Sequence, residues 1–257
     1  MRRVKSAARR VLPRAAYNAL WRAWHAARRL FIYPQQTIGA AADHDAYWAQ
    51  KAGARMGELS AFRRARAEVF AQIIAPGATV LDLGCGDGAI LKYLVEQRGV
   101  RAYGVDLSTE AAAFARAQGL SVMQGDVAGP LAGELDREYD YIILSEIIEH
   151  LPDPEGLLLG LRDRVRAALV VSVPNTGWWQ HRLRLALGRF PLQWVVFPGE
   201  HLRFWTLADF RWWAGALGFE LAGVYPYVGV PALRRVWPGL FAQAFVYVLK
   251  SGGKRPE

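Results

Sequence analysis

The chain has 257 residues, of which 53% are hydrophobic, and it carries a formal net charge of +9. This length suits one large domain, or one domain with an appendage, and the hydrophobic content is ample for a core. The single cysteine, Cys85, excludes an intramolecular disulfide and agrees with a reducing cytosol. Since no apolar run reaches the roughly 18 residues of a membrane span, we expect a cytoplasmic protein.

The positive charge is concentrated at the N-terminus. Residues 1–42 contain nine Arg and Lys and no Asp or Glu, whereas residues 43–257 contain 23 residues of each sign. Phosphate contacts dominate nucleic-acid affinity, and a neutral body does not favour them. The distribution argues against nucleic acid as a partner and assigns the basic character to an N-terminal arm, residues 1–42.

A basic amphipathic helix is the first element that the sequence predicts, from about Pro13 to Phe31, followed by a linker over 34–42. At helical spacing, one face is basic and the other is rich in aromatic residues. The faces comprise Arg14, Asn18, Arg22, His25 and Arg29, and Tyr17, Leu20, Trp21, Trp24, Ala27 and Phe31. This pattern is typical of helices in a membrane interface, so we expect peripheral contact between residues 1–33 and an anionic membrane. The alternatives are a helix docked on the body, a nucleic-acid arm and a targeting segment.

A mostly helical pattern covers residues 43–74, and Pro76-Gly77 then turns the chain into the stretch TVLDLGCGDGA at 79–89. The apolar start of this stretch predicts a buried strand over 79–84. Glycines follow at alternate positions, where backbone can approach a ligand closely, and a helix is predicted over 88–98. Strand, glycine turn and helix together predict the nucleotide-binding unit of a doubly wound α/β sheet.

Carboxylates beside the glycine turn indicate which nucleotide cofactor binds. Asp82 and Asp87 flank the turn and would repel a pyrophosphate, which prefers bare N–H groups and positive charge. S-adenosylmethionine has no phosphate, and its sulfonium and ammonium are both cationic. Asp106 ends the next strand and can accept both ribose hydroxyls, although NAD would use the same residue. The pattern therefore favours S-adenosylmethionine over NAD and disfavours a dehydrogenase.

The chain resembles the class I S-adenosylmethionine-dependent methyltransferases. The motifs that carry the resemblance are VLDLGCGDG (80–88), YGVDLS (103–108), Gly125-Asp126 and YDYIILSEIIEHL (139–151), and it covers roughly residues 43–250. It implies a Rossmann-like, mostly parallel seven-stranded sheet, in which segment 43–74 packs across the open edge of the cofactor site. It also implies that Asp126 meets the adenine amino group, the alternative being a turn former. The cofactor-binding residues expected are Asp82, Gly84, Cys85, Gly86, Asp87, Gly88, Asp106, Leu107, Asp126, Val127 and Ser145.

The remaining elements alternate as an α/β fold requires. Strands are predicted over 101–106, 120–124, 139–145, 167–173, 219–225 and 242–249, with helices over 109–118, 154–165 and 207–217. Thr206 is expected to cap the last helix and Gly218 to end it. The Trp- and Arg-rich residues 176–200 are expected to form a substrate lid, the alternative being a surface helical hairpin. Residues 251–257 are expected to form a disordered tail.

Candidate catalytic residues follow the fourth strand. Glu146 and His150 are four apart, with Glu149 between them, so a helical turn would cluster them. With His201, they resemble the ligand sets of two metal-assisted O-methyltransferase groups, which make ubiquinone precursors and methylate small RNA ends. We therefore expect Glu149, His150 and His201 to be catalytic, with Glu146 completing a site for Mg²⁺ or Mn²⁺. The alternative is that His150 acts as a base or hydrogen-bond partner without a metal.

A second resemblance, to the methionine-biosynthesis W-type methyltransferase-like proteins, extends from Val173-Pro174-Asn175 to His201. Those proteins differ in the second motif and lack the Glu-His pair, which argues against a direct assignment. The sequence thus predicts a methyltransferase that acts on a small, lipophilic or aromatic acceptor, most directly on a hydroxyl. The alternatives are a metal-assisted RNA-end 2′-O-methyltransferase and a non-catalytic, cofactor-binding regulator of a biosynthetic partner.

Overall fold

The computed structural model describes residues 13–31, 45, 48, 56–129, 137–191 and 201–252. The chain divides into two compact units, each of which is made of two segments. One unit comprises residues 1–38 and 179–198, and the other comprises residues 39–178 and 199–257.

The larger unit is built on a seven-stranded sheet, which confirms the predicted fold class. The strand order is β3 (Ser121–Gln124), β2 (Arg101–Asp106), β1 (Thr79–Leu83), β4 (Tyr139–Ser145), β5 (Val165–Pro174), β7 (Ala242–Ser251) and β6 (Phe219–Gly229). The first five strands in this order pair in parallel, and β7 is antiparallel to both β5 and β6. The carboxyl ends of β1, β2 and β4, which carry the predicted site, therefore lie at one edge of the sheet.

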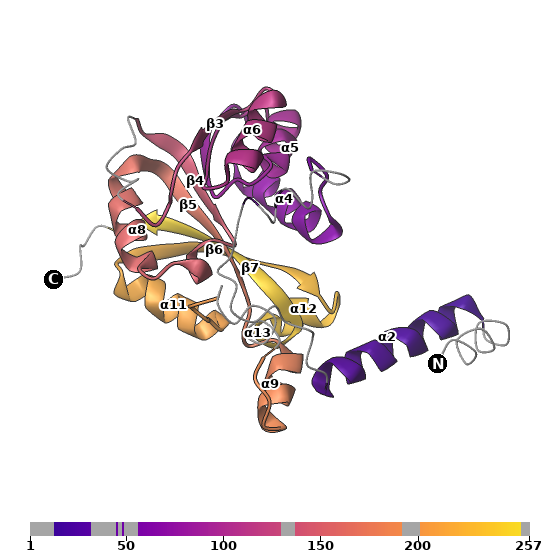
Figure 1. Cartoon of the computed structure of the whole chain (residues 1–257). Helices are drawn as coiled ribbons and strands as arrows, with labels where there is room; N and C mark the ends of the chain where they lie inside the picture. The colour runs from indigo at the N-terminus through magenta and orange to yellow at the C-terminus, as the bar shows by residue number, and fades with distance from the viewer. Residues whose placement is uncertain are drawn as a thin grey trace. The chain divides into compact units, whose positions relative to one another are not determined.

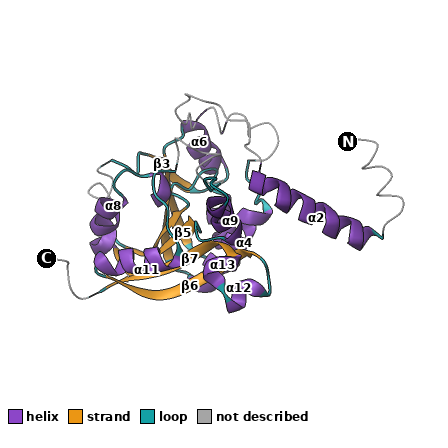
Figure 2. Cartoon of the chain, turned by 90° about the horizontal axis from the view of Figure 1, so that it is seen from below, coloured by secondary structure: helices purple, strands orange, loops and turns teal. Residues whose placement is uncertain are grey.

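Helices cover both faces of this sheet (Figures 1 and 2). On one face lie α4 (Ala61–Ile73), α5 (Ala89–Arg98) and α6 (Thr109–Ala117), and on the other α8 (Pro154–Leu161) and α11 (Leu207–Ala216). Alternate strand residues supply the two cores, because successive side chains of a strand point to opposite faces. In β4, for example, Ile143 packs with the α4–α6 layer, and Ile142 and Leu144 with the α8–α11 layer.

The predicted boundaries hold best in the first half of the sheet, where β1 to β4 end within one residue of their expected positions. The helix predicted over 154–165 ends at Leu161, because the 3₁₀ turn η2 (Arg162–Arg164) follows and β5 begins at Val165. Strand β6 continues through Pro226 to Gly229, which is possible because β6 is an edge strand. Ser251, assigned to the predicted tail, belongs to β7, and residues 253–257 lie outside the described residues.

The N-cap predicted at Thr206 is confirmed. Its side chain accepts a hydrogen bond from Asp209 N at 3.3 Å, and the Asp209 carboxylate accepts one from Thr206 N at 3.2 Å. Between β6 and β7 the chain makes two short helices that the sequence did not predict, α12 (Leu233–Val236) and α13 (Pro238–Phe241). Asn175 fastens this excursion to the end of β5, because its Nδ2 donates to the carbonyls of Gly239 and Ala242.

The smaller unit contains α2 (Arg14–Phe31) and α9 (Trp179–Ala186). The bounds of α2 agree with the predicted amphipathic helix, and α9 lies in the region 176–200 that was predicted as a lid. Residues 192–200, the rest of that region, are outside the described residues. Among the helices that the structure describes, none combines the length and the apolar character that crossing a bilayer requires.

Candidate functional site

The glycine turn lies between β1 and α5, at the carboxyl edge of the sheet. Gly84, Gly86 and Gly88 have φ values of 75°, 57° and 73°, which favour glycine. A Cβ on Gly86 would lie 2.6 Å from the ring of Trp48, and one on Gly84 would lie 2.1 Å from Ile147. The absence of side chains thus lets the turn pass beneath Trp48, a residue of the segment expected to cross the cofactor site.

Asp106, at the end of β2, organises this turn. Its Oδ2 accepts a hydrogen bond from Gly86 N at 2.7 Å, and its Oδ1 accepts one from Ser108 N at 2.9 Å. The Ser108 hydroxyl in turn donates to Asp45 Oδ1 at 2.6 Å. Each carboxylate oxygen has two acceptor positions, which is the capacity that the predicted bonds from two ribose hydroxyls require. Its neighbour Leu107 is exposed.

Cys85 is buried in the turn and is not a reactive thiol. Burial, followed by the nearby carboxylates of Asp82 and Asp106, raises the pKa of its thiol far above the usual range. A Cβ on Gly104 of β2 would lie 2.6 Å from Cys85 Sγ, so the side chain fills the space beside that strand. The contribution of Cys85 to a cofactor site is therefore its backbone and its packing.

Asp87 has a different role from the one its position in the sequence suggested. Its carboxylate forms an ion pair with Arg63 of α4 at 2.5 Å and accepts a hydrogen bond from Gly57 N at 2.9 Å. Burial raises the pKa of Asp87, but the guanidinium of Arg63 and the hydrogen bonds from Gly57 N and Ala89 N together hold it below its usual range. Because Arg63 compensates the charge, Asp87 cannot by itself repel a pyrophosphate, and that argument rests on Asp82.

Asp82 is a buried carboxylate without a compensating hydrogen bond at one oxygen. Among the described residues, neither Asp82 Oδ1 nor the hydroxyl of Ser145 has a hydrogen-bond partner. They lie on adjacent strands, since β1 pairs with β4. Burial raises the pKa of Asp82 to about 7, while Arg66 opposes the shift. A buried acceptor of this kind fits the ammonium group of a bound S-adenosylmethionine better than it fits a phosphate.

The pH dependence of cofactor binding should report the ionisation of Asp82. Between pH 5.5 and 7, we expect the affinity for S-adenosylmethionine to rise with pH. The ammonium group of the cofactor pairs with the ionised form of Asp82, and the pKa of Asp82 in the free protein is about 7. Binding at pH 6 should release a proton and be about tenfold weaker than at the plateau. In the cofactor-free protein, burial of the ionised Asp82 costs free energy that the unfolded chain does not pay. The free energy of unfolding should therefore fall as pH rises from about 4 to about 7.

Titration calorimetry in buffers of different ionisation enthalpy measures this proton release directly. Asp82→Asn should give weaker binding with a flat pH profile. Asp140→Asn is a matched control, since Asp140 lies at the amino end of the neighbouring strand β4 and accepts hydrogen bonds from Thr79 N and Arg166. A sloping profile in Asp82→Asn would assign the proton to another group.

Asp126 and Val127 follow β3. Asp126 Oδ1 accepts a hydrogen bond from Ala128 N at 2.8 Å, which is the turn-forming role named as the alternative. This bond occupies one acceptor position and leaves the adenine contact as a prediction. Val127 is half-buried and packs against the core beside α8 and α11.

Glu146 does not join the predicted metal ligands. Its Oε1 accepts hydrogen bonds from the hydroxyls of Tyr227 and Ser172, each at 3.1 Å, and lies 3.3 Å from Arg66 Nη1. The predicted helical turn fails at this residue, since its φ is 58° and the 3₁₀ turn η1 (Ile148–His150) begins only afterwards. The backbone conformation therefore directs the Glu146 carboxylate to Arg66 of α4 and Tyr227 of β6.

Glu149, His150 and His201 are brought together. One ligand atom from each lies within 4.8 Å of the other two. The chain around His201 is fastened to η1, because Leu202 N and Arg203 N donate to the Glu149 carbonyl at 2.7 and 3.1 Å. The imidazole rings of His150 and His201 are 4.7 Å apart and nearly perpendicular. A contact across 51 residues of sequence thus brings together the three residues that the sequence named as catalytic.

The cluster combines a buried carboxyl group with two half-buried imidazoles. Glu149 is 1% exposed, and neither carboxylate oxygen has a hydrogen-bond partner among the described residues. Burial, and then the charge of Glu146, raises the pKa of Glu149 well above its ordinary value. Burial, and then His150, lowers the pKa of His201 to about 4, so its imidazole is neutral at physiological pH. Once Glu149 has lost its proton, its carboxylate beside neutral imidazole can bind a divalent cation or accept a proton from an acceptor hydroxyl.

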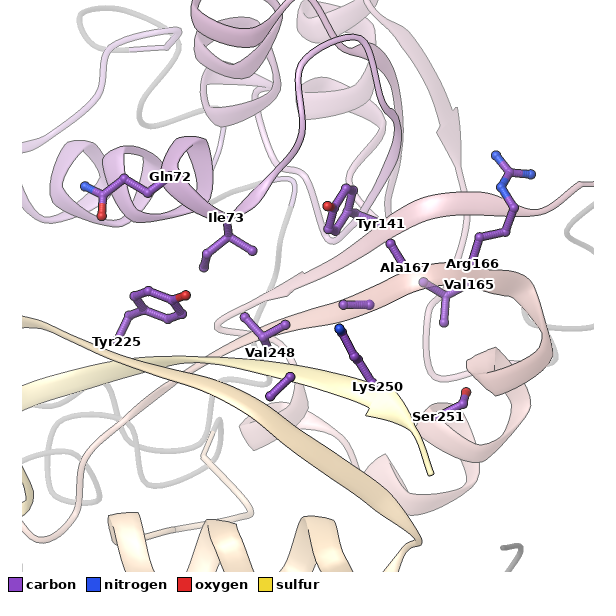
Figure 3. A pocket seen from close by; sticks show the side chains of 12 residues that line it. Gln72, Ile73, Tyr141, Val165, Arg166, Ala167, Tyr225, Val248, Lys250 and Ser251 are labelled. Carbon is purple, nitrogen blue, oxygen red and sulfur yellow. The ribbon is translucent and has the colours of Figure 1, made fainter. Parts of the chain in front are cut away.

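A cavity of about 580 Å³ lies elsewhere on the larger unit (Figure 3). It is lined by the C-terminal end of α4, the first residues of β5 and the last residues of β7, and includes Tyr141, Tyr225 and Lys250. Arg166 at its margin is already paired with Asp140 at 2.9 Å. These residues lie at the amino ends of the parallel strands, and none of the predicted site residues lines the cavity.

Three residues near the site were not predicted from the sequence: Arg63 and Arg66 of α4, and Tyr227 of β6. The two arginines are three positions apart, which places them on one face of a helix. This spacing could have suggested that both arginines face carboxylates of the site. Tyr227 lies beyond the strand end that was predicted at residue 225, and no local pattern marks it.

Comparisons with known proteins concern the family and the fold of this chain. The model of the family described as methionine biosynthesis protein MetW matches residues 64–249. The interpretation of the differing second motif as evidence against a direct assignment was therefore wrong. A bifunctional methionine biosynthesis protein MetXA/MetW from Rhodopirellula baltica is 29% identical over 56% of this chain. The chain spans only 25% of the length of that relative.

A ubiquinone biosynthesis O-methyltransferase from Aeromonas salmonicida is 34% identical, over 58% of this chain and 67% of the relative. The fold is also similar to the crystal structure of a SAM-dependent methyltransferase from Archaeoglobus fulgidus. That similarity has a TM-score of 0.56 at 19% identity and covers 73% of this chain and 92% of the other.

Proposed function

This chain belongs to the methionine biosynthesis protein MetW family and is a class I S-adenosylmethionine-dependent methyltransferase, and we propose that its acceptor is a hydroxyl of a small, lipophilic or aromatic molecule. The observation that carries the proposal is the cluster of buried Glu149 with half-buried His150 and His201 at the carboxyl edge of the sheet. A hydroxyl acceptor must lose a proton during transfer, and this cluster supplies groups that can accept or stabilise that proton.

The proposed site has two parts, one that binds the cofactor and one that receives the acceptor hydroxyl. S-adenosylmethionine supplies an electrophilic methyl group on a sulfonium. Asp106 and the glycine turn hold the ribose, Asp82 pairs with the ammonium group, and Trp48 covers the turn beside Gly86. Positioning of this kind accounts for much of the rate of a displacement reaction.

Glu149, His150 and His201 are placed to receive the acceptor hydroxyl. In one form of the proposal, His150 accepts the hydroxyl proton and Glu149 stabilises the resulting imidazolium. In the other form, the three residues hold Mg²⁺ or Mn²⁺, which would lower the pKa of the bound hydroxyl. The two oxygens of buried Glu149, which have no hydrogen-bond partner among the described residues, fit a cation, since a buried carboxylate without a partner is costly.

A second candidate role is association with a biosynthetic partner enzyme. The bifunctional relative from Rhodopirellula baltica joins two named functions in one chain, of which this chain spans a quarter. In that role, this chain would present the bound cofactor site to its partner, and transfer to a free small molecule would be slow.

A lipophilic acceptor would be found in a bilayer, and the N-terminal arm would bring the enzyme to that acceptor. We include in the proposal that residues 1–33 bring the protein to the surface of an anionic membrane. Nine cations and no acidic residue within residues 1–42 support this contact.

The acceptor class should be identified by transfer of a radiolabelled methyl group in a cell lysate separated into lipid, small-molecule, RNA and protein fractions. We expect label in the lipid or the small-molecule fraction, and loss of that label with His150→Ala. Label in RNA would replace the proposal with the RNA-end alternative. Unlabelled fractions, with binding of S-adenosylmethionine intact, would favour the partner role.

A further inference from the structure

The smaller unit has an extreme charge composition. Residues 1–38 and 179–198 contain twelve Arg and Lys and no Asp or Glu, so the rest of the chain carries a net charge of −3. The cations come from both segments of the unit, three of them from residues 179–198. The basic composition is therefore shared by two segments far apart in the sequence. Within residues 179–198, Arg182 is exposed and Arg189 is half-buried, whereas Arg184 is fully buried.

Contacts join the two helices of this unit. Arg189, just after α9, donates from Nη1 to the carbonyl of Phe31 at 2.7 Å, and its guanidinium lies 5.8 Å from the Phe31 ring. Within the second segment, Arg184 Nε donates to the Phe190 carbonyl at 2.7 Å and holds the turn after α9. Arg28 lies 5.3 Å from the ring of Trp24 on α2.

Both helices expose large apolar side chains beside these cations. On α2, Trp21, Trp24 and Phe31 are exposed, and on α9 and its turn, the exposed residues are Leu183, Leu185, Leu187 and Phe190. Large exposed apolar side chains in a monomer indicate an interaction surface. Trp and Phe beside Arg are typical of helices in the lipid headgroup region. The leucines favour acyl chains over nucleic acid, because an aliphatic side chain neither stacks on a base nor binds a phosphate.

We propose that α2 and the α9 turn together form one binding surface for an anionic lipid bilayer, with Leu187 and Phe190 inserting alongside Trp21 and Trp24. This proposal extends the membrane contact proposed for residues 1–33 to a second segment of the chain. It rests on the proposed function only in that membrane binding would serve to capture a lipophilic acceptor. The exposed cations of both segments, among them Arg28 of α2 and Arg182 of α9, attract the headgroups, and the exposed apolar side chains of both segments enter the interface.

The test is sedimentation of the full chain with vesicles of phosphatidylglycerol and phosphatidylcholine, compared with phosphatidylcholine alone. We expect binding to the anionic vesicles at low salt and partial release at high salt, because salt screens the attraction. Leu187→Glu and Phe190→Glu should each weaken this binding about tenfold, comparable to Trp24→Glu. Trp212→Glu is the matched control, since Trp212 of α11 is 74% exposed, more than Phe190 at 59%, but belongs to the larger unit.

Calorimetry with S-adenosylmethionine separates this proposal from the proposed function. The affinity of Phe190→Glu for the cofactor should equal that of the wild type, which also shows that the variant folds. Wild-type vesicle binding by Leu187→Glu and Phe190→Glu, with loss in Trp24→Glu, would confine the surface to α2 and overturn the inference. Binding to an RNA oligonucleotide in place of vesicles, or a dimer that covers the apolar residues, would overturn it as well.

Discussion

Asp106→Ala should weaken the binding of S-adenosylmethionine by about 2–4 kcal/mol, roughly 30- to 1,000-fold in affinity, if the two ribose hydroxyls donate to this carboxylate. The carboxylate ends β2, and its two oxygens already accept bonds from Gly86 N and Ser108 N. The variant therefore loses the ribose contacts and releases the glycine turn at the same time. Calorimetry with S-adenosylmethionine and its demethylated product measures the loss.

Two controls separate these contributions. Asp106→Asn keeps the shape of the side chain but weakens its acceptor capacity, so it should retain more thermal stability than Asp106→Ala while still losing affinity. Asp140→Ala removes a carboxylate that likewise accepts a backbone hydrogen bond, from Thr79 N at 2.7 Å. Asp140→Ala should bind the cofactor as the wild type does, since it lies at the opposite ends of the strands. Equal affinity of the wild type for NAD would contradict the cofactor assignment itself.

Glu149→Gln should lower kcat by about 10²- to 10⁴-fold, the range for loss of a group that handles a proton. Its free energy of unfolding should not fall, because glutamine removes a buried carboxylate whose oxygens lack hydrogen-bond partners among the described residues. Steady-state kinetics and denaturant unfolding give the two results. Glu155→Gln is the control, since Glu155 accepts a hydrogen bond from Trp213 Nε1 at 2.7 Å and is not part of the cluster.

Chelation distinguishes the two forms of the proposed chemistry. If Glu149, His150 and His201 hold a divalent ion, turnover should fall with chelator and return with Mg²⁺ or Mn²⁺, and Glu149→Gln should lose Mn²⁺ binding in calorimetry. If turnover survives exhaustive chelation and His150→Ala is still inactive, His150 acts as the base. A Glu149→Gln variant with wild-type kcat would remove the residue from both forms.

The sequence predicted the features that depend on short stretches of chain. Alternation of apolar residues, glycine at positions of positive φ and the cap at Thr206 are local properties, so β1 to β4, the turn at 84–88 and the start of α11 were all predicted. Glu149 and His150 could be named for the same reason, because they are adjacent in one motif at the end of β4. The residue types beside the glycine turn sufficed to predict S-adenosylmethionine as the cofactor. The charge of Asp87, however, is compensated by Arg63 and does not support that prediction.

Tertiary structure decided which side chains meet. The carboxylate of Glu146 could ligate a metal in a helical turn, but its φ of 58° and its partner Tyr227, 81 residues further along, direct it elsewhere. Arg63 compensates Asp87 from a helix that precedes the glycine turn, and the carbonyl of Glu149 fastens the segment that carries His201. Likewise, Arg189 joins the α9 turn to α2. Each of these pairings depends on the packing of distant elements, and a local pattern of residues carries no information about a partner that only the folded chain brings near.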